Sequence, residues 1–270
     1  MKPSVAGALI ACLLQTLTVG ADCSRVDARP SDGSPKITAI LARERSPGPG
    51  LSGSLGDYRF DKVLENMTIR LHRGDLPDLS RYTTSVAIDT ETMGLNPHRD
   101  RLCVVQMSNG DGSADIVQVP KGHTDAPNLK KLLADPAITK IFHFARFDLA
   151  ALYNAFGVMP QPVYCTKIAS RLSRTYTDRH GLKDLVREML NIELSKQQQS
   201  SDWGSESLSE AQLAYAASDV LHLHALREKL DPMLAREGRT DLARACFEFL
   251  PSRARLDLQG WEAEDIFAHS

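Results

Sequence analysis

The run SVAIDTE, residues 85–91, carries the strongest signal for the fold of this chain. Its apolar start and acidic end predict a short buried strand. A strand places every second side chain on one face, so the carboxylates of Asp89 and Glu91 lie side by side. Two like charges repel, and burial strengthens that repulsion, so a site that keeps both usually holds a cation. The pattern D-x-E alone is more often a pair of exposed loop acids. Evidence from other segments is therefore needed to distinguish a cation site from such loop acids.

The sequence around this run alternates between strand and helix patterns. The turn at residues 109–112, Asn-Gly-Asp-Gly, joins two of the strands as a hairpin. Further strands are predicted at 101–108, 114–119, 138–144 and 163–165, and helices at 128–133 and 146–156. Three hairpin-linked strands followed by a β-α-β unit and then helices predict an α/β fold, a mixed sheet flanked by helices.

The last third of the chain has a helical pattern. Ser209 and Gln212 have the spacing of a capping box, which marks the start of a helix. The apolar periodicity beyond it predicts one long helix that runs through Tyr215, Asp219 and Leu226.

Composition limits the class of protein. The chain has 270 residues, 42% of them apolar and 24% charged, with a formal net charge of −2. These values exclude a disordered chain and a collagen, and they exclude a protein that coats nucleic acid through bulk positive charge. No apolar run reaches the roughly 18 residues of a membrane span. The five cysteines include no C-x-x-C pair, which favours free thiols in a reducing compartment and thus a cytoplasmic location.

The first 66 residues differ from the rest. Residues 46–56, SPGPGLSGSLG, contain nine Ser, Pro or Gly in eleven positions, as in a linker. The apolar run at 6–14 leaves an export signal open, and the alternative is sequence translated upstream of a true start at Met67. The second interpretation is favoured, so we expect 1–66 to be a disordered leader and 67–270 to be one domain.

Two more acids complete a set with the D-x-E pair. Asp148 follows an apolar strand, in the first turn of a helix, and Asp219 lies amid apolar residues of the last helix. Tyr215, four residues before Asp219, is on the same helix face. Each residue alone has an ordinary structural explanation, such as a helix-start acid or a polar stripe. Together, four carboxylates can hold two Mg²⁺ or Mn²⁺ ions, and two such ions about 3.5–4 Å apart promote an in-line displacement at phosphorus.

Three segments that contain these acids resemble the exonuclease motifs of the DEDD superfamily: VAIDTET, FHFARFD and YAASDVLHL. The Tyr-x-x-x-Asp form is similar to the DEDDy branch, which includes ribonuclease D. Further segments, among them LNPHRDRLCVVQ, CTKIASRL, RTYTDRHGLK and GWEAEDIFAHS, resemble the nanoRNase C family of bacterial enzymes that degrade very short RNAs. The resemblance covers residues 67–270 and implies the ribonuclease H-like DEDD exonuclease fold and a homo-octamer.

The resemblance also implies roles for five residues. Asp89, Glu91, Asp148 and Asp219 would be the metal ligands, and Tyr215 would orient the nucleophilic water.

Candidate substrate contacts lie near the motifs. Thr90 lies between the first two acids. Leu95 follows the first motif, where a leucine of related enzymes separates the last two bases, although a core or loop leucine is an equal alternative. His143 precedes the second motif and is expected either to touch the substrate backbone or to be a satisfied histidine at a strand end.

A basic cluster in RTYTDRHGLK adds Arg174, Tyr176, Arg179 and His180 to the candidate substrate contacts. Arginine side chains and helix N-termini bind phosphate, and a helix begins directly after this segment. The cluster is expected to cap the 5′ phosphate of a short substrate, and a solvated basic loop is the alternative.

The sequence therefore predicts a two-metal 3′–5′ exoribonuclease. Its expected substrates are short single-stranded RNAs, especially 5′-phosphorylated dinucleotides, which it hydrolyses to 5′ mononucleotides. One alternative is a general 3′–5′ exonuclease that trims longer RNA or DNA. The other is an inactive nucleic-acid-binding module, against which the complete set of acids and Tyr215 argues.

Overall fold

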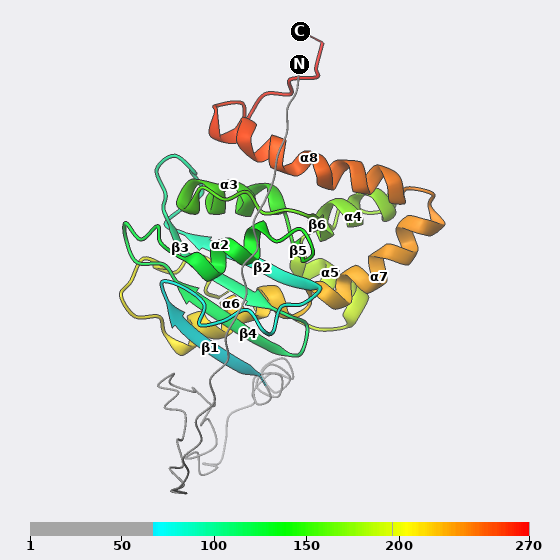
Figure 1. The fold of residues 1–270 in the computed structure, drawn as a ribbon. Coiled ribbons are helices and arrows are strands. Elements are labelled where there is room, and N and C mark those ends of the chain that lie inside the picture. Colours follow the sequence, from blue (N-terminus) through cyan, green and yellow to red (C-terminus); the bar gives the residue numbers. More distant parts are fainter. Residues whose placement is uncertain (1–66, 196, 270) are drawn as a thin grey trace, which may run out of the picture. The chain divides into compact units, whose positions relative to one another are not determined.

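A mixed sheet of six strands is the centre of the fold in the computed structural model, which describes residues 67–195 and 197–269 (Figure 1). The expectation for residues 1–66 lies outside the described residues. In spatial order the strands are β1 (Thr68–Arg73), β4 (Ser113–Gln118), β3 (Leu102–Ser108), β2 (Ser85–Thr92), β5 (Thr139–Phe142) and β6 (Val163–Cys165). Strands β2, β3 and β4 pair antiparallel, and the other pairs are parallel. The predicted α/β fold with a mixed sheet is confirmed.

Helices cover this sheet. They are α2 (Pro127–Ala134), α3 (Ala145–Phe156), α4 (Thr166–Ser173), α5 (Leu182–Leu190), α6 (Glu210–Leu221), α7 (Leu223–Arg236) and α8 (Thr240–Leu258). Helix α6 packs on β2, β3 and β4, whereas α3 packs on β2, β5 and β6, and α8 lies across α3 and α4 (Figure 1). All residues of β3 and β4 are buried, so the core lies along these central strands.

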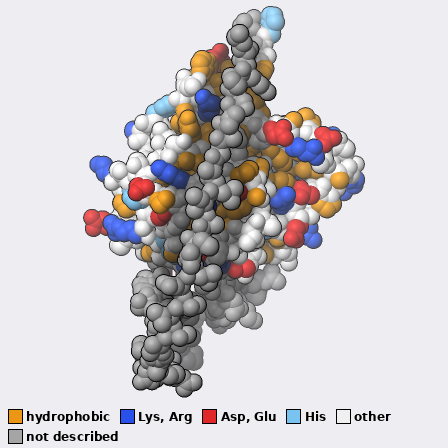
Figure 2. Space-filling model, in the orientation of Figure 1, with side chains coloured by type: hydrophobic (Ala, Val, Ile, Leu, Met, Phe, Trp, Pro, Cys, Tyr) orange, Lys and Arg blue, Asp and Glu red, His pale blue; other side chains and the backbone are white. Residues whose placement is uncertain are grey.

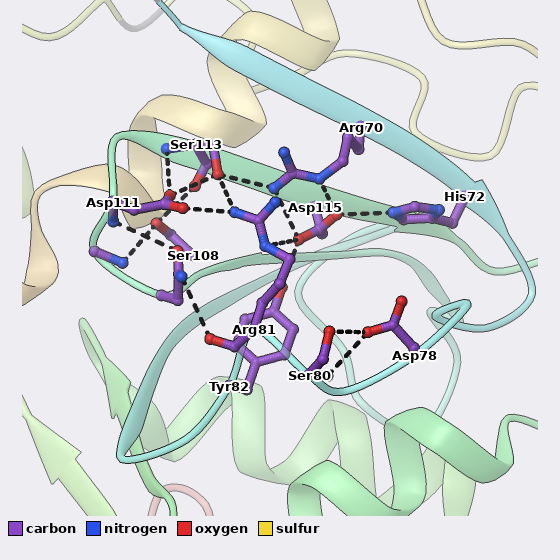
Figure 3. A network of polar contacts seen from close by, with 12 residues as sticks. Arg70, His72, Asp78, Ser80, Arg81, Tyr82, Ser108, Asp111, Ser113 and Asp115 are labelled. Carbon is purple, nitrogen blue, oxygen red and sulfur yellow. Dashed lines mark hydrogen bonds and ion pairs between the residues drawn. The ribbon is translucent and has the colours of Figure 1, made fainter. Parts of the chain in front are cut away.

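Strand β1 was not predicted, because in its sequence TIRLHR the two apolar residues alternate with polar and basic ones and form no apolar run. A buried acid on β4 stabilises its pairing (Figure 3). Asp115 accepts hydrogen bonds from Arg70 Nε at 2.7 Å, from His72 Nε2 at 2.9 Å and from the Tyr82 hydroxyl at 2.8 Å. Burial opposes ionisation of Asp115, but these donors outweigh it and hold the pKa of Asp115 well below its usual value.

The prediction of one long helix through Tyr215, Asp219 and Leu226 was wrong. Helix α6 ends at Leu221, and α7 begins at Leu223. Helix α6 packs on the sheet, whereas α7 packs against α4 and α5. The break therefore lets consecutive segments cover different partners, a tertiary effect that apolar periodicity does not reveal.

The connection from β5 to α3 positions the second motif. The strand predicted at 138–144 ends at Phe142, and Phe144 takes a left-handed conformation with φ 69°. A non-glycine residue in this region is uncommon, and here it turns the chain from the strand directly into α3. Asp148 thereby lies in the first turn of α3 and is buried.

Charges of both signs are interspersed on the face drawn in Figure 2, in agreement with the net charge of −2. None of the helices in the described ranges combines the length and apolar character that crossing a membrane requires.

Candidate active site

Three carboxylates from β2 and α6 meet at one end of the sheet. One oxygen each of Asp89, Glu91 and Asp219 lies within 4.8 Å of the others. The parallel neighbour β5 pairs with β2 only as far as Ala87, so both acids of β2 lie beyond that pairing. Helix α6 packs directly on β2 and brings Asp219 to them. The expected same-face placement of Asp89 and Glu91 is what allows this cluster to form.

Helix α6 also places a tyrosine at the cluster. The predicted capping box is present, because the Ser209 hydroxyl accepts from the Gln212 backbone N–H and the Gln212 side chain accepts from the Ser209 backbone N–H. Tyr215 lies one turn before Asp219 on the helix that this box begins. Burial, followed by the negative charges of Asp219, Glu91 and Asp89, raises the pKa of the Tyr215 phenol. The phenol therefore keeps its proton at neutral pH and is a hydrogen-bond donor at the cluster.

Asp148, the fourth predicted acid, lies outside this group of three. It is only 2% exposed, and one of its carboxylate oxygens accepts a hydrogen bond of 2.7 Å from the Thr90 hydroxyl. Burial, followed by the negative charge of Asp89, raises the pKa of Asp148. The carboxylate is thus close enough to Asp89 to respond to its charge.

The acids are costly to ionise together. Burial raises the pKa of Asp89 to about 7, although hydrogen bonds from the Thr90 backbone and the Gln106 side chain oppose the shift. Burial and then repulsion by Asp89, Asp219 and Asp148 raise the pKa of Glu91 to about 10. Burial and then Asp89 also raise the pKa of Asp219. A bound cation would relieve this repulsion, and the carboxylate oxygens are hard ligands of the type that Mg²⁺ and Mn²⁺ prefer. The donor set therefore fits a divalent metal ion.

The cluster opens into a cavity of about 730 Å³. This volume is within the range of about 300–1,000 Å³ typical of small-ligand sites. Leu95 is 84% exposed at the cavity. His143 also lines the cavity, with Nδ1 2.9 Å from the Thr166 hydroxyl. Burial and then the charge of Lys167 lower the pKa of His143 to about 3, so the ring is neutral at physiological pH. Thr90 lines the cavity too, but its hydroxyl donates to Asp148.

The basic segment RTYTDRHGLK runs beside this cavity, but only its end lines it. Lys183 lines the cavity, whereas Tyr176, Arg179 and His180 do not; Tyr176 is exposed. His180 Nδ1 lies 2.8 Å from the Ser170 hydroxyl.

Arg174 requires a correction, because the structure does not bring it to the cavity. Its side chain is 1% exposed. The guanidinium donates to the Ser170 hydroxyl, to the Arg179 carbonyl and to Glu188. A buried guanidinium with these partners holds the loop together and has no open face for a substrate phosphate.

Comparisons with known proteins agree with this geometry. A family model described as 3′–5′ exonuclease matches residues 74–235. A structure of Brucella melitensis NrnC bound to pGG is 66% identical, with a TM-score of 0.74, and the match covers 76% of this chain and 100% of that chain. A structure of the same Brucella melitensis protein with bound Mg²⁺ is 65% identical, with a TM-score of 0.73 and the same coverage.

The chain belongs to the NrnC family of 3′–5′ exonucleases. The sequence-based resemblance to nanoRNase C, the DEDD exonuclease fold and membership of a 3′–5′ exonuclease family are confirmed. Ribonuclease D of Granulibacter bethesdensis is 37% identical over 154 residues, which cover 57% of this chain and 38% of that protein. This NrnC-family chain thus spans less than half the length of that curated relative.

Several residues in or beside the site of this NrnC-family chain were missed by reasoning from the sequence. One is Gln106, which is buried behind the cluster and whose amide Nε2 donates to Asp89 at 2.7 Å. A single polar residue inside the apolar run LCVVQMS was the signal that could have indicated it. The others line the cavity from the second motif, from α4 and from the segment before α6: Phe144, Phe147, Lys167, Gln199, Ser200, Ser201 and Trp203.

Proposed function

We propose that this chain degrades very short single-stranded RNAs from the 3′ end, with 5′-phosphorylated dinucleotides as the preferred substrates and 5′ mononucleotides as products. The observation that carries the proposal is the cluster of Asp89, Glu91 and Asp219 that opens into a cavity of about 730 Å³. Such a cavity suits a short anionic ligand better than a long strand. A relative at 66% identity has a structure bound to pGG, which supports the same substrate class.

We further propose that Asp89, Glu91, Asp148 and Asp219 hold two divalent ions, Mg²⁺ or Mn²⁺. Bound ions of this kind would polarise the scissile phosphate and lower the pKa of a bound water. Tyr215, as a protonated donor beside Asp219, is proposed to orient the attacking water. The Mg²⁺-bound structure of the Brucella melitensis relative supports the metal requirement.

Substrate contacts are proposed for the residues around the cavity. Leu95, exposed at the cavity, offers an apolar side chain to the last two bases, and His143 and Thr90 line the same cavity. The proposed 5′-phosphate cap comprises Tyr176, Arg179 and His180, with Lys183 at the cavity end of the same segment. Arg174 supports this loop from within and is not proposed as a contact.

The proposal extends to the whole protein. We infer that residues 67–270 form the exonuclease domain, that the enzyme acts in the cytoplasm, and that it assembles as a homo-octamer. The mass of the full chain in solution tests the assembly, and an octameric mass is expected.

The experiment for the function is the initial rate of hydrolysis against substrate length, from two to about ten nucleotides, with and without a 5′ phosphate. We expect the two-residue RNA with a 5′ phosphate to be hydrolysed fastest, because only a short chain brings its phosphate to the cap while its 3′ end lies at the acids. Arg179→Ala should flatten this preference, since a charge-assisted contact to the phosphate would be lost.

The alternatives give other profiles in the same assay. A flat profile, or one that rises with length, would favour the general trimming activity of the ribonuclease D relatives. Equal rates on DNA would extend the substrate class to DNA. Binding without hydrolysis in the presence of Mg²⁺ or Mn²⁺ would favour the inactive binding module.

A further inference from the structure

Gln106 is a fully buried polar residue at the centre of the sheet. It lies on β3 directly opposite Asp89 of β2 in the antiparallel register. Its amide Nε2 donates a hydrogen bond of 2.7 Å to Oδ2 of Asp89. The backbone ladder therefore fixes this side chain beside the acid, on a rigid strand and not on a loop.

Burial of Gln106 lowers the stability of the fold. Its Oε1 is buried and has no hydrogen-bond partner among the described residues. An unpaired buried acceptor lowers stability, and an apolar residue of similar size would avoid the loss, as at the buried neighbours Val105 and Met107. Among the described residues, the hydrogen bond to Asp89 is the only one that the Gln106 amide makes.

The chemistry of an amide donor suits a carboxylate that binds a cation. The bond occupies one lone pair of Oδ2 and restricts rotation of the carboxylate, which keeps further lone pairs for a cation. The donor is uncharged, so the negative charge of Asp89 remains available. A lysine or arginine in the same place would neutralise that charge.

We propose that Gln106 is a positioning residue for the reaction, which holds the Asp89 carboxylate in the orientation that binds the divalent ion. This inference rests on the proposed function. Partners that orient metal ligands typically change metal affinity by about 10–100-fold when they are removed.

The test uses the full chain with Gln106→Leu, which removes the donor and the unpaired acceptor together. Gln106→Met, an unbranched side chain of similar length, covers the case in which leucine does not pack. Met107→Leu, a conservative change at the adjacent buried position of β3, is the control. Three quantities are measured for each protein: Mg²⁺ affinity by calorimetry without RNA, kcat and KM for a 5′-phosphorylated two-residue RNA, and the melting temperature in EDTA.

We expect both Gln106 variants to bind Mg²⁺ about 10–100-fold more weakly and to have a lower kcat at saturating Mg²⁺, with little change in KM. Their melting temperature in EDTA should stay close to that of the wild type, because removal of the unpaired acceptor offsets the loss of the hydrogen bond to Asp89. The Met107→Leu control should match the wild type in all three.

Unchanged Mg²⁺ affinity in both Gln106 variants would overturn the inference. So would a fall in melting temperature in both variants that parallels the loss of affinity, since that pattern indicates a structural role. If the wild type binds Mg²⁺ but hydrolyses no RNA, the proposed function fails, whereas the affinities still decide whether Gln106 orients Asp89.

Discussion

The hydroxyl of Thr90 donates a hydrogen bond of 2.7 Å to a carboxylate oxygen of Asp148 and so links β2 to the first turn of α3. Thr90 lies between Asp89 and Glu91, and the strand alternation directs its side chain away from theirs. The segment 89–91 of β2 therefore supplies two acids to the cluster, and its central residue Thr90 holds Asp148.

Thr90→Val tests this link, because it removes the hydroxyl and nearly preserves the shape. We expect the free energy of unfolding to fall by about 1–3 kcal/mol, since a buried polar partner is left unpaired. Turnover should fall as well, because Asp148 loses the donor that fixes its orientation. Urea unfolding and initial rates measure the two effects. Thr90→Ser keeps the hydroxyl and should stay close to the wild type; equal behaviour of the valine and serine variants would refute the role.

The pH dependence of stability follows from the raised pKa values of the acids. Burial and repulsion raise the pKa of Asp89 to about 7 and that of Glu91 to about 10. Above a pH of about 4 the unfolded chain has released these protons while the folded chain retains them, so stability falls as pH rises towards the folded pKa values. The melting temperature in EDTA should therefore decrease between about pH 5 and about pH 8, and Mg²⁺ should restore it.

Glu91→Gln isolates one of these groups. It removes an ionisable side chain from the cluster, so the decrease in melting temperature should become shallower and the metal-free protein should be more stable at neutral pH. Glu193→Gln, which changes an exposed glutamate, is the control and should keep the wild-type slope. If the slope of melting temperature against pH were unchanged in Glu91→Gln, the pKa of Glu91 would not be raised by folding.

The network around Asp115 makes a separate prediction about stability (Figure 3). Asp115→Asn removes the charge that pairs with Arg70 and His72, and the loss in unfolding free energy should be about 3 kcal/mol. Asp111→Asn, at a position 47% exposed, should lose less than about 1 kcal/mol. Chemical denaturation at neutral pH compares the two. Similar losses in unfolding free energy for the two variants would show that the buried network of Asp115 is no more stabilising than the exposed ion pair of Asp111.

Tyr215→Phe tests the proposed water-orienting group. The ring should still pack near Trp203, whose centroid is 6.1 Å away, so folding and substrate affinity should change little. Turnover should fall by about 100-fold, because positioning acts on the chemical step. Steady-state kinetics on the two-residue RNA separates kcat from KM, and an unchanged kcat would remove Tyr215 from the mechanism.

Local sequence patterns predicted the parts of the fold that depend on neighbours in the chain. The apolar run before Asp89 predicted β2, and the strand period placed Asp89 and Glu91 together. The capping box at Ser209 and Gln212 predicted the start of α6. These signals sufficed because each is set by residues within a few positions of one another.

Features set by contacts between distant segments were not predictable in this way. Strand β1 depends on Asp115, and the break between α6 and α7 depends on which elements each helix covers. The sequence predicted a phosphate contact for Arg174, whereas the structure places its guanidinium against Glu188. Gln106 was not singled out, because its relation to Asp89 exists only in the register of β2 and β3.

We propose the cluster of Asp89, Glu91 and Asp219 as the catalytic site for short RNA. The most direct test is the initial rate of hydrolysis of a 5′-phosphorylated two-residue RNA by the wild type and by Asp219→Asn, at equal protein concentration with Mg²⁺ or Mn²⁺ supplied. The wild type should release 5′ mononucleotides, and Asp219→Asn should remain folded and lose at least about 1,000-fold in rate. A folded Asp219→Asn protein with a rate near that of the wild type would contradict the account.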